Sequence, residues 1–429
     1  MTQDADGGGP VLMYSHLELF AHSGADVTLV LVQRARGSLG FERYTETDRE
    51  TWGRVRGWCE AHHMLRIPAA PARASAPLTH FLRGIRDPGA YLFPDITPSV
   101  LESFERLVSE SGVDLIWAEN LFPGLLATRA QVAVPVVFSH HDRIFRLFRN
   151  WGTNTEFGWR RRFVSWTGER LEKRVIRSAS ACASGSVVEA RDLGRLNGGP
   201  VAYLPTTYAA SPWDTTAKIP QAARIVHLGG MNTIANRGGL ARFLAVAWPR
   251  LRSGNGKAPE FWVVGNLAGA SETLRADLAS SGAVMTGFVR DLAEVLRPGD
   301  IHVVPWEHAT GTRTRIPVIL RHGQVLLSTR AAAACLPELR DGEDCVLVDD
   351  LTAMAEEIRI LAKDREKRAR LARAARISFE RHFVREAVQP RFDAFLEEAA
   401  PKRFGPRTAP GRPSARRLLL SFLAGRKRI

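Results

Sequence analysis

The feature that most constrains the fold of this chain is a regular alternation of short apolar segments with longer amphipathic ones. In the first half, the short segments with the composition of buried strands are 26–32, 113–118, 134–139, 179–185 and 200–205. The stretches 98–112 and 121–131 between them have helical periodicity. Strands that alternate with helices predict α/β units built on parallel sheets.

The alternation restarts after a polar, proline-containing segment at 206–222, which we interpret as a linker. The strand-like segments that follow it are 224–230, 261–266, 284–289, 300–306, 324–329 and 345–350. Because 429 residues exceed what one hydrophobic core usually supports, two domains are expected. We predict two Rossmann-like domains, at residues 1–213 and 220–382. Residues 383–429 follow the second domain.

The charge balance predicts an anionic partner. The formal net charge is +14, and residues 401–429 contain many Arg and Lys but no acid. Nucleic acid, anionic lipid and phosphorylated small molecules are all partners that such a charge would attract. A general preference for arginine codons is the alternative explanation of the charge. No nucleic-acid recognition pattern is present, and basic residues are not interleaved with aromatic ones, so we do not expect nucleic acid to be a partner.

Other bulk features exclude several classes of protein. No apolar run approaches the roughly 18 residues of a membrane span. The start of the sequence lacks the pattern of a signal peptide, so we expect a cytoplasmic protein. The four cysteines have no CxxC spacing, which favours buried free thiols over a metal site or a disulfide.

Three predicted strands of the second half end on glycine, at Gly229–Gly230, Gly265 and Gly287. Ligands of open parallel sheets bind beyond the carboxyl ends of the strands. Glycine at that edge lets backbone N–H groups approach an anion, and a following helix N-terminus favours negative charge. The pattern is not GxGxxG, so a nicotinamide dinucleotide is disfavoured.

A further strand end carries a glycine and two arginines, in the segment IHVVPWEHATGTRTRIPVILRHG at 301–323. Gly311 is followed by Arg313 and Arg315. The two side chains point the same way if the segment is extended and diverge if it is helical. Arginine suits phosphate because its planar fork donates two hydrogen bonds and keeps its charge. A phosphate site is our interpretation, and a solvated arginine pair is the alternative.

In order, these segments of the second half resemble the GT-B glycosyltransferases, specifically the large retaining group called family 4 or group 1. The resemblance covers about residues 222–385, through HLGGMNTIANRGG, FWVVGN, VMTGFVRDLAEVLRPGDIHVVPW, TGTRTRIPVILRHGQVLLST and LRDGEDCVLVDD. The first half resembles the acceptor domain of the same group more loosely, through GGGPVLMYSHLELFAHSGADVTLVLV, DLIWAEN, VPVVFSHHD, ASGSVVEA and VAYLPTTY. The apolar strand that should precede the glycine loop is missing. Either the sequence begins downstream of the true start, or the domain has lost its first central strand.

The resemblance implies an enzyme of class EC 2.4, of the hexosyltransferase type, with the two domains of the GT-B fold. It implies that the helix at 383–400 returns to the first domain. It also implies transfer with retention from a nucleoside-diphosphate sugar of UDP or GDP type, to a glycan or lipid-linked acceptor in polysaccharide or glycolipid synthesis. Cationic side chains and helix N-termini can stabilise the leaving diphosphate, so no metal and no other cofactor is expected.

The resemblance also assigns residues to the two sides of the site. The expected donor-binding residues are Gly229, Gly230, Asn232, Arg237, Gly265, Phe288, Val289, Gly311, Arg313 and Arg315, with Asn236 in the same loop region. The expected catalytic or acceptor-side residues are Glu119, His141, Asp142 and Thr310. Glu119 is a candidate acceptor base or else an exposed acid at a helix start. His141 contacts sugar or acceptor, or is a strand-end histidine satisfied by backbone. Arg237 holds phosphate or only begins a helix.

Two departures from the family pattern matter. Family members carry two glutamates where this sequence has Thr310 and Val318, and Glu307 lies near the first position but not at it. A GT-B-fold protein that binds nucleotide sugar or glycan without turnover is therefore the alternative function. The tail RRLLLSFLAGRKRI within 401–429 combines apolar residues with cations, which predicts either an interfacial helix on the inner leaflet of the plasma membrane or a disordered tail.

Overall fold

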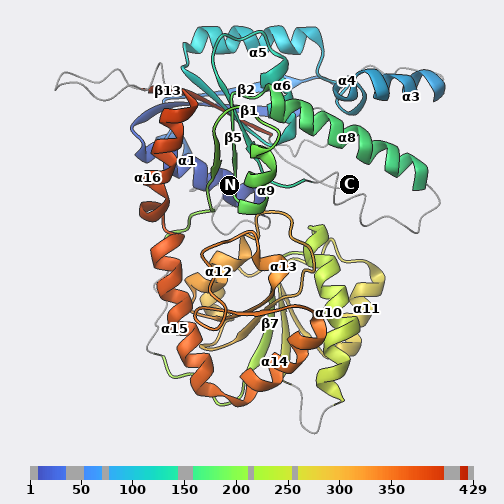
Figure 1. The fold of residues 1–429 in the computed structure, drawn as a ribbon, viewed down its shortest axis with the longest axis vertical. Helices are drawn as coiled ribbons and strands as arrows, with labels where there is room; N and C mark the ends of the chain where they lie inside the picture. Colours follow the sequence, from blue (N-terminus) through green and yellow to red (C-terminus); the bar gives the residue numbers. More distant parts are fainter. Residues whose placement is uncertain are drawn as a thin grey trace, which may run out of the picture.

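Two parallel sheets, one above the other in Figure 1, organise the chain. The computed structural model describes residues 8–34, 53–69, 77–143, 158–210, 217–253, 259–400 and 416–423. The upper, N-terminal sheet has seven strands in the order β2-β1-β13-β3-β4-β5-β6, and the lower, C-terminal sheet has six in the order β12-β11-β10-β7-β8-β9. All pairs of neighbouring strands in the described parts of these sheets are parallel. The predicted two-domain α/β fold is confirmed.

The N-terminal domain consists of β1 (Ala25–Arg34), β2 (Ala61–Ile67), β3 (Leu115–Glu119), β4 (Val136–His140), β5 (Ala181–Ser184), β6 (Val201–Tyr203) and β13 (Arg416–Leu423). Its helices are α1 (Gly8–His22), α3 (Pro77–Arg86), α4 (Pro88–Leu92), α5 (Pro98–Ser111), α6 (Leu121–Arg129), α8 (Gly158–Ser178) and α9 (Val187–Gly194). Each strand segment predicted in the first half is present, and the edge strand β2 is an addition.

The C-terminal domain consists of β7 (Arg224–Leu228), β8 (Glu260–Val264), β9 (Val284–Gly287), β10 (Ile301–Val304), β11 (Val325–Thr329) and β12 (Val346–Val348). Its helices are α10 (Ile234–Arg252), α11 (Glu272–Ser281), α12 (Arg315–Arg321), α13 (Arg330–Ala333), α14 (Leu351–Lys363) and α15 (Arg365–His382). All six predicted strands are present. Strands β7, β10 and β11 are buried along their whole length, as expected for the inner strands of a parallel sheet covered by helices on both faces.

The last helix, α16 (Arg385–Ala399), packs on the N-terminal domain although α15 before it lies along the C-terminal one (Figure 1). Phe392 of α16 meets Phe20 of α1 edge-on, with ring centroids 4.8 Å apart. It also contacts Trp117 of β3, and all three side chains are fully buried. Within the described residues, the chain therefore crosses between the domains twice, once before β7 and once before α16.

Strand β13 corrects the prediction for the tail. It lies between β1 and β3, in register from Ala25↔Arg416 to Val32↔Leu423 on one side and from Leu418↔Leu115 to Ser421↔Ala118 on the other. Residues 418–421 are fully buried, so they cannot contact a lipid surface. An interfacial helix or a disordered tail is therefore wrong for 416–423, while 401–415 and 424–429 lie outside the described residues.

The same strand resolves the question of the missing first strand. The central position beside β1 is occupied, but by a segment from the far end of the sequence. Leu418 and Leu420 enter one hydrophobic cluster and Leu419 enters the other, so β13 contributes to the cores on both faces of the sheet. A run of leucines is what such a doubly covered parallel strand requires.

Candidate active site

The candidate site lies where the carboxyl ends of both sheets face one another. On the C-terminal side, the glycines predicted to end strands lie next to each other: the Gly229 N–H donates to Val264 O at 2.8 Å, and the Gly265 N–H donates to Gly287 O at 2.9 Å. A Cβ on Gly265 would lie 2.5 Å from the Gly229 carbonyl, and Gly265 has a φ of 146°. Only glycine fits here without strain, which keeps backbone at this edge open to close approach.

The first turn of α10 braces the loop that follows β7. Thr233 caps the helix, and its hydroxyl accepts from the Asn236 N–H. The Asn236 side chain donates to Gly230 O at 2.8 Å, and Arg237 Nη1 donates to Met231 O at 2.8 Å. Arg237 thus begins a helix and also holds the loop of Gly229 and Gly230, while the neighbouring Asn232 is exposed.

The two arginines of the predicted phosphate loop diverge, because α12 begins at Arg315. Arg313 turns back on its own loop, where its Nε donates to Thr310 O at 2.9 Å and its guanidinium lies 5.7 Å from the ring centre of Trp306. Arg315 points inward beneath β7, and its Nη1 donates to Leu228 O at 3.1 Å and to His227 Nε2 at 3.0 Å.

Arg315 is the most unusual charge in the site. It is buried, yet no carboxylate pairs with it among the described residues, and its Nη2 has no hydrogen-bond partner there. Burial, with a smaller contribution from Arg313, lowers the pKa of Arg315. Burial and the charge of Arg315 likewise lower the pKa of His227, so that this imidazole accepts as a neutral ring. A buried cation without a counter-ion is costly, and a bound anion would offset that cost.

Across the cleft, Glu119 at the end of β3 joins two histidines. Its Oε1 accepts from His16 Nδ1 at 2.5 Å and from Trp117 Nε1 at 2.7 Å, and its Oε2 accepts from His141 Nε2 at 2.5 Å. Burial opposes ionisation, but the two histidines outweigh it and lower the pKa of Glu119 well below the usual range.

This arrangement corrects the prediction for Glu119. The side chain is fully buried and both oxygens are occupied, so it is neither an acceptor base nor an exposed acid at a helix start. It orients His141 instead. With Nε2 committed to Glu119, the Nδ1 atom of His141 is the ring nitrogen with no hydrogen bond to another described residue.

A second buried network connects the two domains. The ring of His140 lies between two carboxylates, with Nδ1 3.1 Å from Glu189 and Nε2 3.0 Å from Glu172. Because ionised carboxylates only accept hydrogen bonds, both ring nitrogens must carry protons. Burial by itself would lower the pKa of His140, but the hydrogen bonds to the two glutamates raise it to about 10.

Glu189 also reaches the phosphate loop predicted from the sequence. Its Oε1 accepts from the Gly311 N–H at 3.0 Å, and Thr312 Oγ1 donates to His141 O at 3.1 Å. Asp142 lies against the same loop, where a Cβ on Gly311 would be 2.2 Å from its Oδ1. Burial, with Glu189 beside it, raises the pKa of Asp142 to about 6. Sequence reasoning missed Glu189, Glu172, His140 and His16.

The remaining predicted residues lie at the rim. Phe288, after β9, is 53% exposed, and Val289 next to it is half-buried. Thr310 is half-buried, and its hydroxyl accepts from Trp306 Nε1 at 3.3 Å. Glu307, the acid nearest to that position, pairs instead with Arg242 at 3.0 Å on the surface. Glu307 therefore does not take the place of the missing glutamate at Thr310.

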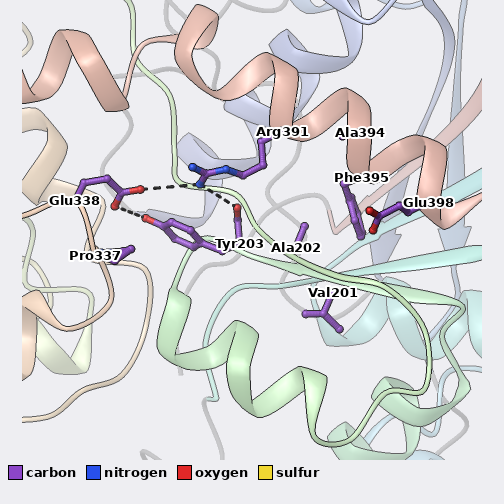
Figure 2. A pocket seen from close by; sticks show the side chains of 9 residues that line it. All are labelled: Val201, Ala202, Tyr203, Pro337, Glu338, Arg391, Ala394, Phe395 and Glu398. Atoms are coloured by element: carbon purple, nitrogen blue, oxygen red, sulfur yellow. Dashed lines mark hydrogen bonds and ion pairs between the residues drawn. The ribbon is translucent and has the colours of Figure 1, made fainter.

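A separate cavity of about 410 Å³ lies at the junction of β6, the segment after α13, and α16 (Figure 2). Tyr203 Oη donates to Glu338 Oε2 at 2.9 Å across the two domains. Arg391 of α16 lies over both, 3.4 Å from Tyr203 O and 3.9 Å from Glu338 Oε1. These contacts connect β6 and α16 of the N-terminal domain with Glu338 of the C-terminal domain.

Within the described residues, no group of three or more His, Cys, Asp or Glu side chains is arranged to hold a metal ion. The cysteines within this part of the chain are all free, and Cys59 is the one that is not fully buried. None of the described helices has the length and apolar character that crossing a bilayer would require.

Comparison with known proteins now relates this geometry to a family. A model of a glycosyl transferase 4-like domain matches residues 7–207, and a model of glycosyl transferases group 1 matches residues 222–364. Together the two models match well over half of the chain. No curated protein sequence matches it significantly.

Several solved structures share the fold at low sequence identity. HepE from Anabaena, solved in complex with UDP, is 12% identical with a TM-score of 0.58, and the match covers 87% of this chain and 99% of that one. Sucrose-phosphate synthase from Thermosynechococcus elongatus is 16% identical with a TM-score of 0.60, covering 87% and 98%. A glycosyltransferase from Rickettsia africae is 12% identical with a TM-score of 0.53, covering 87% and 98%. The two domain matches and the shared fold identify the chain as a GT-B glycosyltransferase.

Proposed function

We propose that this enzyme transfers a sugar, with retention, from a nucleoside-diphosphate sugar to a glycan or lipid-linked acceptor. The observation that carries the proposal is Arg315, a buried cation at the carboxyl edge of the C-terminal sheet with an unpartnered N–H. A diphosphate supplies the anionic oxygens that this guanidinium lacks.

The surroundings of Arg315 suit a diphosphate. It bonds to the residue just before Gly229, and the loop at Gly229 and Gly230 leads directly into the N-terminus of α10. Helix N-termini and open glycine backbone favour phosphate. Arg237 and Arg313 add positive charge at the rim. Such preorganised donors stabilise the charge that develops on the departing diphosphate.

Our proposal for the identity of the donor is based on solved structures of a protein with the same fold. HepE was solved with UDP, with UDP and glucose, and with UDP-glucose. We therefore propose a UDP sugar as donor, ahead of a GDP sugar, with the base near Phe288 and Val289. The reaction would be of the hexosyltransferase type and would need no metal for the diphosphate.

On the other side of the cleft, His141 and Asp142 would face the sugar or the acceptor. Glu119 holds His141 by Nε2, which leaves Nδ1 to bond a substrate hydroxyl. The acceptor would be a glycan or a lipid-linked glycan of cell-surface polysaccharide or glycolipid synthesis, and the enzyme would work in the cytoplasm.

A second function, binding of nucleotide sugar or glycan without turnover, is favoured by one observation. Thr310 stands where family members have an acid, and Glu307, the acid nearest to it in the sequence on that side, pairs with Arg242 instead. The arginine site would then bind a donor that the protein does not use.

The test is isothermal titration of the full chain with UDP and with GDP, on wild type and on Arg315→Ala, Arg315→Lys and Arg242→Ala. We expect UDP to bind, and its Kd to rise about ten- to a hundredfold in Arg315→Ala, since a hydrogen bond to a charged group is worth about 1.5–3 kcal/mol. Arg315→Lys should retain part of the affinity, and Arg242→Ala, on the exposed surface, should retain all of it. If neither nucleotide binds wild type, the donor site is refuted; an unchanged Kd in both Arg315 variants refutes its role.

Turnover is tested separately with UDP-glucose and other UDP sugars, by following release of UDP. Release that saturates with donor supports the enzyme. Saturable binding without release of UDP, in the presence of any glycan acceptor tried, supports the binding protein.

A further inference from the structure

The phosphate loop predicted from the sequence, residues 310–314 between β10 and α12, is seated against the N-terminal domain. Two glycines show how closely the two surfaces fit. A Cβ on Gly185, which follows β5, would clash with the methyl group of Thr312. A Cβ on Gly311 would occupy the space of Asp142 Oδ1, at the end of β4. The loop and the strand ends of the other domain therefore fit together only because both positions are glycine.

Two carboxylates of the N-terminal domain lie against this loop, and their surroundings differ. Glu189 is buried, and its two oxygens are engaged: Oε1 accepts from the Gly311 N–H and Oε2 from His140. Asp142 is exposed to the cleft, and none of the described residues donates a hydrogen bond to its carboxylate. Glu189 thus holds the loop in place, and Asp142 is the acid that remains open to a ligand.

The charges around Asp142 come from both domains. Arg313 faces it from the loop, Glu189 from α9, and His140 and His141 from the end of β4. Although the side chain opens to the cleft, protein atoms of both domains surround it. This desolvation, with Glu189 adding to it, raises the pKa of Asp142 to about 6, and the positive groups act in the opposite direction. The acid is therefore ionised at neutral pH.

The same loop connects Asp142 with the proposed diphosphate site. Gly311, beside Asp142, and Arg315, at the diphosphate, are four residues apart, so at most about 14 Å of chain separates them. The proposed acceptor lies on the N-terminal side of the cleft. A sugar attached to a diphosphate on Arg315 has to face that side to be transferred, and Asp142 lies there.

We propose that Asp142 is a catalytic residue that contacts the donor sugar and supplies, from the N-terminal domain, the negative charge that Thr310 does not supply. This inference rests on the proposed function. In the transfer, the bond from the anomeric carbon to the diphosphate oxygen breaks, its electron pair leaves with the diphosphate, and positive charge develops on the sugar ring. The acceptor oxygen bonds to that carbon, and its proton passes to the departing diphosphate. Asp142 stays ionised, accepts a hydrogen bond from a sugar hydroxyl and stabilises the positive charge.

An acid that belongs to the N-terminal domain acts only while the two domains are in contact. An acid at Thr310 would stay with the donor-binding domain, whereas Asp142 meets the sugar only when the loop is seated against β4. The hydrogen bond from the Gly311 N–H to Glu189 maintains this contact, so Glu189 is a positioning residue for Asp142.

The first test is isothermal titration of the full chain with UDP, UDP-glucose, UDP-galactose and UDP-N-acetylglucosamine. Asp142→Asn keeps the size of the side chain. In this variant the Kd of each sugar nucleotide that binds wild type should rise about five- to tenfold relative to the Kd of UDP, because an amide accepts a weaker hydrogen bond than a carboxylate. The Kd for UDP itself should not rise, since the contact is to the sugar. Glu307→Gln, which removes an acid from the same strand end, should leave all values unchanged.

A rescue experiment separates a catalytic role from a structural one. Release of UDP in the presence of acceptor should slow on the order of a hundredfold in Asp142→Asn. Adding Thr310→Glu returns a carboxylate from the other side of the loop and should restore about tenfold of that loss. Adding Thr310→Gln, which has the same size but no charge, should restore none. Hydrogen exchange of the peptide that contains Gly311 should be the same in wild type and in Asp142→Asn.

The pH profile gives an independent readout. In wild type, kcat/KM for the sugar nucleotide should fall about tenfold per unit below about pH 6, as Asp142 takes up a proton. This fall should be absent in Asp142→Asn. An acid limb that is the same in both proteins would contradict the role of Asp142.

The outcomes distinguish this inference from the proposed function. If UDP binds wild type but Asp142→Asn changes neither the ratio of Kd values nor the rate, Asp142 does not contact the sugar and the donor site still stands. If no nucleotide binds wild type, the donor site is wrong and the role of Asp142 is overturned with it. If UDP sugars bind without turnover, the ratio of Kd values decides, and an unchanged ratio overturns the contact. Faster exchange around Gly311 in Asp142→Asn, without rescue by Thr310→Glu, would make Asp142 structural.

Discussion

Truncation of one leucine in β13 should destabilise the N-terminal domain as strongly as truncation in any central strand. Leu420 is fully buried, lies opposite Leu29 of β1 and Trp117 of β3, and belongs to the core cluster that includes α1 and α16. Leu→Ala at such positions costs about 3–5 kcal/mol. Since a domain is stable by about 5–15 kcal/mol, the substitution should remove a large fraction of that stability.

A second substitution, at Leu419, distinguishes a buried strand from a helix at this position. The side chain of Leu419 enters the cluster on the other face of the sheet, so Leu419→Ala should cost a similar amount. A tail helix lying on the domain would bury one side only, and the two adjacent substitutions would then differ widely. Ile377→Ala, at a residue that is 54% exposed on α15, is the matched control and should change stability by less than about 0.5 kcal/mol.

The assay is hydrogen exchange under native conditions, read separately for peptides of β1 and β3 and for peptides of β7 and β8. A two-domain protein need not unfold in one step, so a single melting temperature would mix the domains. We expect faster exchange in β1 and β3 for both leucine variants, with the C-terminal peptides as an internal reference. Deletion of residues 416–429 should abolish protection in β1 and β3. If both leucine variants exchange like wild type, β13 does not occupy the centre of this sheet.

Three further predictions concern the polar networks. Tyr203→Phe removes the hydroxyl that bonds Glu338 across the domains and should cost about 1–3 kcal/mol, measured as faster native-state hydrogen exchange in the peptides that contain Tyr203 and Glu338; unchanged exchange in both peptides would refute the contact. His140 has a folded pKa of about 10, above its unfolded value, so its stabilisation is complete below about pH 6.5 and is lost as the pH rises towards 10. Wild type should therefore lose up to about 1.4 kcal/mol per pH unit in that window in urea titrations, and His140→Gln should lose less; parallel curves would contradict this. Glu119→Gln should leave the Kd for UDP unchanged, because Glu119 and Arg315 share no hydrogen-bond partner among the described residues. It should slow transfer, because His141 loses the carboxylate that orients it; an increased Kd would show that the two sides are not separate.

The sequence predicted the strands of both sheets well because most are apolar runs bounded by glycine, proline or polar residues. Strand β2 was not predicted from the sequence, and the reason is physical. As an edge strand it is mostly exposed, and the segment AHHMLRI has no apolar run. β13 was recognised as apolar but assigned the wrong environment. Its leucines flanked by arginines suit an interfacial helix and a buried parallel strand equally, and only pairing with β1, almost 400 residues earlier in the sequence, distinguishes them.

In the candidate site, too, some features could be predicted from the sequence and others could not. Glycines at strand ends are predictable, because the carboxyl edge of a parallel sheet is where backbone must turn sharply or meet a ligand. The direction of Arg315 was not predictable, since it depends on α12 starting at that residue. Glu189 illustrates the limit best. Its position three residues after Ser186 is the signature of a helix start, and Ser186 does cap α9 by accepting from the Glu189 N–H. That local role gives no sign that the side chain reaches His140 and Gly311.

The distribution of charge across the cleft favours donor binding on the C-terminal side and acceptor binding on the N-terminal side. This assignment does not depend on the missing glutamates. On the N-terminal side, the carboxylates of Glu119 and Glu189 are hydrogen-bonded to histidines, so both are held within the fold. On the C-terminal side, Arg315 has no counter-ion among the described residues. An anionic donor therefore gains most on the C-terminal face, and a neutral hydroxyl acceptor loses least on the N-terminal one. It follows that substitutions at Arg315 should act on the Kd for nucleotide and substitutions around His141 on the rate of transfer. A variant of His141 that weakened UDP binding as much as Arg315→Ala would contradict this polarity.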